Sequence, residues 1–66
     1  MAVLKVNELL ANSDESWEDA AKKAVAQAAK SVDNIRSVYI SEQSATVKDG
    51  KIESYRVNAK VTFEVK

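Results

Sequence analysis

The sequence predicts a small α+β domain whose elements follow a β-α-β-β order. Apolar residues recur at three- and four-residue steps over residues 14–32, which is the period of an amphipathic helix. Residues 52–65 alternate between apolar and polar, which is the period of a strand. An Asp49-Gly50 pair precedes this strand, as expected for a tight hairpin with a second strand before it.

The chain is expected to form a single domain over residues 1–66, because one glycine, no proline and no low-complexity run leave nothing to mark a linker. So short a chain buries only about 60% of its unfolded surface and usually needs disulfides, a metal or self-association. The sequence has no cysteine and no histidine. This excludes disulfides, Cys/His zinc sites and nucleophilic sites that use either residue.

Charge and the N-terminal segment limit the expected partners. Ten basic residues balance ten acidic ones, and no aromatic stripe is interleaved with Lys and Arg. We therefore expect neither a nucleic acid nor a membrane as partner. Residues 1–10 are interrupted by Lys5, Asn7 and Glu8, unlike a signal peptide or a membrane span, so a cytoplasmic location is expected.

The first strand is predicted over residues 3–10, where apolar and β-branched residues are frequent. A break is expected at residues 11–13. The helix is predicted over residues 14–32 with Ser13 as its N-cap, because carboxylates follow in the first turn and interact with the positive end of the helix dipole.

The two faces of the predicted helix differ sharply. The apolar stripe contains Trp17, Ala20, Ala21, Ala24, Val25, Ala28 and Val32. Its alanines allow a close approach to the sheet, and Trp17 is interpreted as a packing residue rather than a ligand-stacking one. On the solvated face, Glu18 precedes Lys22 and Asp19 precedes Lys23 by four residues, which predicts two weak ion pairs.

The second strand is predicted over residues 35–47, and the third strand has two distinct faces. One face of the third strand contains Glu53, Tyr55, Val57, Ala59, Val61, Phe63 and Val65, and the other includes Ser54, Arg56, Asn58 and Lys60. A strand of about 13 residues extends roughly 40 Å, whereas a helix of about 19 residues reaches roughly 28 Å. One helix cannot cover such a hairpin, so we expect the strands to curl or copies of the chain to cover them.

No residue set predicts a reaction. The carboxylates Asp14, Glu15, Glu18 and Asp19 could bind calcium, but the EF-hand pattern is absent and a helix-dipole role explains them. Glu42 with Glu53, or Asp33 with Asp49, could be a catalytic pair of carboxylates. These residues are interpreted instead as solvated surface. Without a Gly-rich phosphate loop or a nucleophile with its base, the protein is predicted not to be an enzyme.

Several short segments, in their order and spacing, resemble one family. They are residues 13–17 (Ser-Asp-Glu-Ser-Trp), Ala20-Ala21, Ala24-Val25, residues 31–35 (Ser-Val-Asp-Asn-Ile), Tyr55-Arg56-Val57 and residues 60–63 (Lys-Val-Thr-Phe). The chain is similar to the dodecins over about residues 5–63. This resemblance implies a three-stranded antiparallel sheet wrapped around one helix, and assembly as a hollow homododecamer.

Flavin-type dodecins bind riboflavin or related flavins such as FMN in pairs at two-fold interfaces, to store them. The resemblance places their stacking Trp at Ser37 and their amide Gln at Arg56. A hydroxymethyl group cannot stack, and a guanidinium donates but does not accept, so a degenerate flavin site is expected. The Tyr39 ring could stack on a flavin instead, but it would lie about 6 to 7 Å further along the strand than Ser37. Ser37, Tyr39, Gln43 and Arg56 are the candidate ligand-binding residues.

A second branch of the family, described as calcium-binding, is more similar to this chain. The matching segments are Ser16-Trp17, Asn34-Ile35-Arg36 and Glu42-Gln43. No calcium ligand can be carried over residue by residue, so the metal ligands stay unknown. We therefore expect a non-enzymatic homo-oligomeric shell that binds, stores or buffers a small ligand or ion. The alternatives are a flavin-storing dodecin and a purely structural assembly module.

Overall fold

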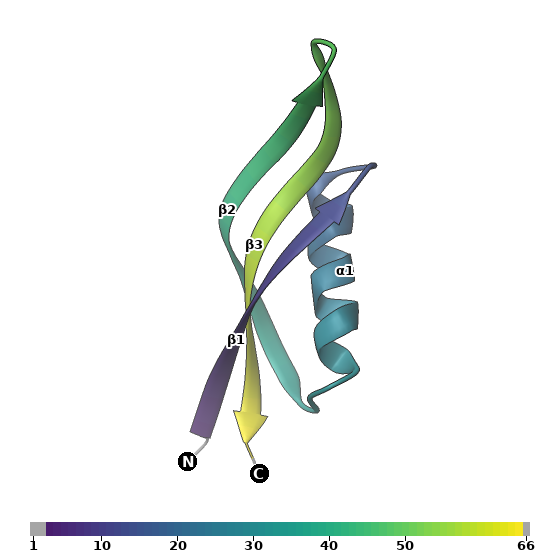
Figure 1. Cartoon of the computed structure of the whole chain (residues 1–66). Helices are drawn as coiled ribbons and strands as arrows, with labels where there is room; N and C mark the ends of the chain where they lie inside the picture. The colour runs from purple at the N-terminus through teal and green to yellow at the C-terminus, as the bar shows by residue number, and fades with distance from the viewer. Residues whose placement is uncertain (1–2, 66) are drawn as a thin grey trace.

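A computed structural model describes residues 3–65 and shows one helix lying along a three-stranded sheet (Figure 1). The elements are β1 (Val3–Ser13), α1 (Trp17–Ala29), β2 (Ile35–Lys48) and β3 (Lys51–Val65). The sheet is antiparallel with the order β1-β3-β2, so the most regularly alternating strand is central. The predicted α+β class and β-α-β-β order are confirmed.

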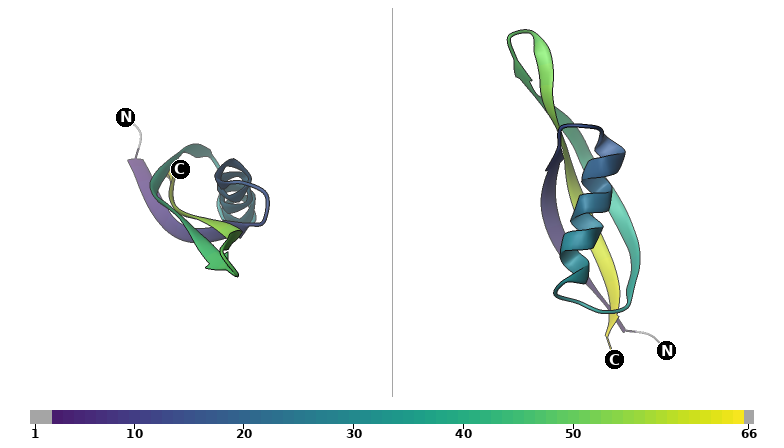
Figure 2. Two further views of the ribbon diagram at one scale, coloured as in Figure 1. Left: turned by 90° about the horizontal axis from the view of Figure 1, so that it is seen from above. Right: turned by 90° about the vertical axis from the view of Figure 1, so that its right-hand side faces the viewer.

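The sheet curves partly around the helix, as the end-on view in Figure 2 shows. β1 pairs with β3 without interruption, from Val3 opposite Val65 to Ser13 opposite Tyr55. β2 pairs with the other edge of β3 but has irregularities in register at three places, one of them between Ile40 and Glu42. Such bulges bend a strand and increase its twist, which helps a long strand to follow a helix.

The core lies between α1 and the odd-numbered residues of β3. Its fully buried apolar residues are Ala20, Ala24 and Ala28 from the helix and Val57, Ala59 and Val61 from β3. The alanines of the predicted helix stripe and the middle of the predicted β3 face are thereby confirmed as core, since small helical side chains let the two backbones approach. Trp17 is half-buried and lies edge-on to Tyr55, with ring centroids 4.8 Å apart, which confirms its interpretation as a packing residue.

The helix is shorter at both ends than the predicted range 14–32, and its cap was predicted wrongly. The N-cap is Ser16, whose Oγ accepts a hydrogen bond from the Asp19 N–H at 2.9 Å. Ser13 instead ends β1, and its Oγ accepts the Glu15 N–H at 2.9 Å in the connecting turn. A serine oxygen can satisfy either a cap or a turn, and cross-strand pairing holds Ser13 in the sheet.

The break predicted at residues 11–13 is also wrong, because this segment continues β1. Ala11, Asn12 and Ser13 pair with β3 in unbroken register. These three residues alone do not show the alternation of apolar and polar residues that indicates a strand. Its extended conformation follows from the backbone hydrogen-bonding groups that central β3 offers along its whole length.

The β2–β3 hairpin has the predicted two-residue turn. Asp49 and Gly50 have φ angles of 55° and 75°, the positive values that a tight hairpin turn requires. The described chain measures 51 × 19 × 13 Å, whereas a 13-residue helix spans roughly 20 Å. The hairpin therefore extends well beyond α1 (Figure 1), as expected from the strand length.

The sheet face turned away from α1, called the outer face here, is not covered within one chain. Leu4, Val6 and Leu10 of β1 pair with even-numbered residues of β3 and lie on this face, with 53%, 58% and 82% of their surface exposed. So much exposed apolar surface on one side of a small sheet favours contact with another molecule. Within residues 3–65, no helix is long and apolar enough to cross a membrane.

Candidate functional site

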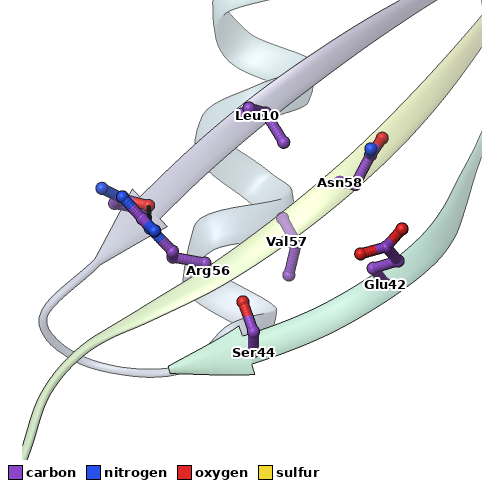
Figure 3. A pocket seen from close by; sticks show the side chains of 7 residues that line it. Leu10, Glu42, Ser44, Arg56, Val57 and Asn58 are labelled. Carbon is purple, nitrogen blue, oxygen red and sulfur yellow. Dashed lines mark hydrogen bonds between the residues drawn. The ribbon is translucent and has the colours of Figure 1, made fainter. Parts of the chain in front are cut away.

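A cleft of about 310 Å³ is open on the outer face, near the middle of the sheet (Figure 3). All three strands contribute to it: Leu10 and Asn12 from β1, Glu42 and Ser44 from β2, and Arg56, Val57 and Asn58 from β3. Strand pairing arranges its polar side chains in two rows across the sheet, with Arg56 at the centre of one row and Asn58 at the centre of the other. We refer to this site as the outer cleft.

Arg56 is the cationic residue of the outer cleft. Its Nε–H donates to Asn12 Oδ1 at 3.3 Å, and its side chain leans toward β1, away from Glu42 (Figure 3). In the described part of the chain no carboxylate lies within 4 Å of its guanidinium nitrogens, the limit for an ion pair. Arg56 is thus oriented by a neutral amide and keeps its charge and most of its donors available.

Asn58 contributes an unsatisfied acceptor. Its Oδ1 is buried and has no hydrogen-bond partner, the single such side-chain atom in residues 3–65. The side chain lies between Leu10 on β1 and Glu42 on β2 (Figure 3). A buried unpaired acceptor costs about 1 to 3 kcal/mol, so a hydrogen-bond donor that entered the outer cleft would recover part of this energy.

Of the predicted candidates, only Arg56 lies in the outer cleft. Ser37 and Tyr39 are on the same face but pair with Thr62 and Lys60. Six and four residues of β3 separate these partners from Arg56, which corresponds to roughly 20 and 13 Å along the strand. One chain therefore does not bring the Ser37 and Tyr39 positions together with Arg56.

Gln43 lies on the opposite face of the sheet from Arg56. It pairs with Val57, whose side chain points toward α1. Ser37 and Gln43 have the same parity in sequence, but the bulge between Ile40 and Glu42 inverts the alternation beyond it. The shared face that simple parity suggests is lost, and Glu42 occupies the outer cleft instead.

Sequence reasoning did not select Leu10, Asn12, Glu42 or Ser44 as site residues. The signal that could have found them is the β1–β3 and β2–β3 register, because it places these residues on either side of Arg56 and Asn58. That register depends on recognising residues 11–13 as strand and on locating the bulge. Neither feature shows in the local periodicity.

The acidic residues near the helix start do not form a metal-binding cluster. Within residues 3–65 no group of three or more Asp, Glu, His or Cys side chains could hold a metal ion. Glu18 and Asp19 form the two predicted ion pairs with Lys22 and Lys23, at 3.5 and 3.2 Å. A hydrogen bond from Ser13, followed by the contact with Lys23, lowers the pKa of Asp19 below its ordinary value.

The comparisons with known proteins agree with this fold. Residues 3–66 match the family model described as Dodecin, so the chain belongs to the dodecin family. It is 38% identical over all of its 66 residues to the calcium dodecin of Mycobacterium tuberculosis, and the match covers 93% of that protein. The family expected from the sequence, and the similarity to its calcium branch, are confirmed.

Solved structures show the same architecture. A variant of the T. thermophilus dodecin has a TM-score of 0.94 at 27% identity, with 100% of this chain and 98% of that chain covered. The calcium dodecin of M. tuberculosis, described as calcium-chelating, has a TM-score of 0.83 at 42% identity, covering 97% and 91%. The dodecin of Streptomyces coelicolor, at 18% identity and a TM-score of 0.93, supports the fold alone.

Proposed function

We propose that this protein assembles with copies of itself into a hollow dodecameric shell that binds and stores a small ligand in the cytoplasm, without catalysis. The observation that carries this proposal is the uncovered outer face. Leu4, Val6 and Leu10 expose apolar surface there, and Leu10 also lines the outer cleft. A helix covers only the other face of the sheet, so a second copy is the natural cover for this one.

A second apolar surface supports self-association. A groove of about 400 Å³ lies between α1 and β2, and its lining residues are Ala21, Val25, Ala26 and Val38 together with Glu18 and Lys22. Both the sheet and the helix thus keep apolar surface open in the single chain. A subunit with two open surfaces can contact more than one neighbour, which a closed shell requires.

The outer cleft is the best supported ligand site. Its volume is at the lower end of the range for small-molecule sites, and it combines an apolar wall with a few convergent polar groups. An interface between outer faces would enlarge and close it. Flavin storage is the first alternative for this site, and the stacking ring would then have to come from Tyr39 of another copy.

Calcium binding is a second candidate, favoured by the similarity to the calcium dodecin of M. tuberculosis. The carboxylates of one chain do not fit a calcium site, because the described residues hold no suitable cluster. Calcium would therefore need ligands from more than one copy or from main-chain carbonyls. Assembly without any ligand, as a structural module, is the third candidate.

Native mass spectrometry of freshly purified, undialysed protein tests the proposal, because one spectrum gives both the subunit number and the mass of a retained ligand. We expect twelve subunits with additional mass. A bare dodecamer that takes up no flavin, calcium or other small molecule would support the structural module. A monomer or dimer would contradict the proposed shell.

A further inference from the structure

We propose that the outer cleft selects small molecules that carry an oxyanion, a phosphate or a carboxylate, and that Arg56 is the residue that selects them. This inference rests on the proposed ligand-storage function and adds the chemical class of the ligand. Three features of the outer cleft carry it: the partner of Arg56, the position of Glu42 and the unsatisfied oxygen of Asn58.

The two arginines of the described chain differ in how their charge is compensated. Arg36 donates from Nε to Glu64 Oε1 at 3.0 Å, and its Nη2 lies 2.9 Å from the same oxygen. Arg56 has only the neutral Asn12 amide, 3.3 Å from its Nε. The free guanidinium donors form a planar fork, which matches two oxygens of a carboxylate or phosphate.

The position of Glu42 makes the two ends of the outer cleft electrostatically different. Glu42 lies on β2, whereas the Arg56 side chain leans toward β1, so the negative and positive groups face opposite ends (Figure 3). An anionic group is repelled at the β2 end and attracted at the β1 end. The bound oxyanion therefore lies beside Arg56 and Asn12.

The opposite end of the outer cleft accepts hydrogen bonds. Asn58 Oδ1 is buried without a partner, and the Glu42 carboxylate lies on the neighbouring strand. Leu10, 82% exposed, adds an apolar wall on the β1 side, across β3 from Glu42. The preferred ligand thus has an oxyanion at one end, an apolar body and an N–H or O–H donor at the other.

Two ligands with the same ring system test this selection. Riboflavin and riboflavin 5′-phosphate differ by one phosphate, and quenching of flavin fluorescence reports the binding of each to the intact assembly. We expect about tenfold tighter binding of the phosphate form by the unmodified protein at low salt. The preference should disappear in Arg56→Gln and persist in the matched control Arg36→Gln.

Inorganic pyrophosphate provides a second test that needs no flavin ring. At constant ionic strength it should raise the melting temperature of the unmodified protein and of Arg36→Gln, but not that of Arg56→Gln. Equal binding of both flavins, or a phosphate preference that Arg56→Gln retains, would overturn the inference. Absence of stabilisation by pyrophosphate together with no binding of riboflavin 5′-phosphate would overturn it as well.

The mass spectrum separates these results from failure of the proposed function. If the dodecamer binds neutral riboflavin and riboflavin 5′-phosphate with equal affinity, the proposed storage function stands. Only the selection by Arg56 is then contradicted. A chain that does not assemble contradicts the proposed shell itself. Sedimentation of both arginine variants shows whether each still forms the same assembly as the unmodified protein.

Discussion

The Trp17 indole Nε1–H donates a hydrogen bond to the main-chain carbonyl oxygen of Ser44, 2.8 Å away. This contact joins the first residue of α1 to β2, and the Ser44 side chain lines the outer cleft on the other face of the sheet. The helix therefore helps to hold the strand that shapes the candidate site. The edge-on contact with Tyr55 keeps the indole in place.

We expect Trp17→Phe to lower the free energy of unfolding by about 1 kcal/mol, because it removes this hydrogen bond and keeps the aromatic contact. Trp17→Leu should cost more, since it also loses the aromatic pair. Urea unfolding followed by circular dichroism at fixed subunit concentration measures both. If Trp17→Phe were as stable as the unmodified protein, the hydrogen bond would have no role in stability.

The alanine row of α1 should not tolerate larger side chains. Ala24 is 1% exposed and belongs to the row that packs on β3, so Ala24→Leu should cost about 1 to 3 kcal/mol through overpacking. Ala29 is exposed at the end of the helix, and Ala29→Leu should stay within about 0.5 kcal/mol. Thermal unfolding of the two variants compares them directly. Equal costs would contradict the close helix–sheet packing.

Acid should weaken the junction between β1 and α1. Ser13 Oγ donates to Asp19 Oδ2 at 2.6 Å, and this bond, followed by the contact with Lys23, lowers the pKa of Asp19. A group whose pKa is lower in the folded state stabilises the fold above its unfolded pKa, here about 4. That contribution is lost as the pH falls through the lower folded pKa.

The carboxyl titration of Asp19 followed by NMR tests this prediction. Ser13→Ala should raise the pKa of Asp19 toward its ordinary value, and Lys23→Gln should raise it less, because the hydrogen bond with Ser13 is the larger cause. Asp19→Asn should reduce the loss of stability below about pH 4. A pKa that Ser13→Ala left unchanged would contradict the assigned cause.

The outer face should control assembly rather than the folding of one chain. We expect the double variant Leu4→Ser and Val6→Ser to form smaller species, because both side chains are more than half exposed within the subunit and need a partner surface. Sedimentation velocity measures the size, and circular dichroism checks the secondary structure. Lys30→Ser, an exposed change near the end of α1, is the control. Unchanged assembly of the double variant would show that other surfaces hold the copies together.

Local periodicity in the sequence was enough to predict several features of this fold. The alternation of residues 52–65 predicted the two faces of β3, and the alanines of the helix predicted the face that packs on it. The positive φ angles at Asp49 and Gly50 follow from their turn chemistry. These features need only neighbouring residues, so a pattern in the chain is sufficient to find them.

The set of residues that share the outer cleft depends on how the three strands pair, and no local pattern predicts it. Asn12 is polar and lies in strand because β3 pairs with it, so its contact with Arg56 depends on a residue 44 positions away in the chain. The bulge after Ile40 places Gln43 on the helix side of the sheet, where it is exposed, and brings Glu42 to the outer face. Register and bulges result from how three strands curve around one helix, and no single segment contains that information.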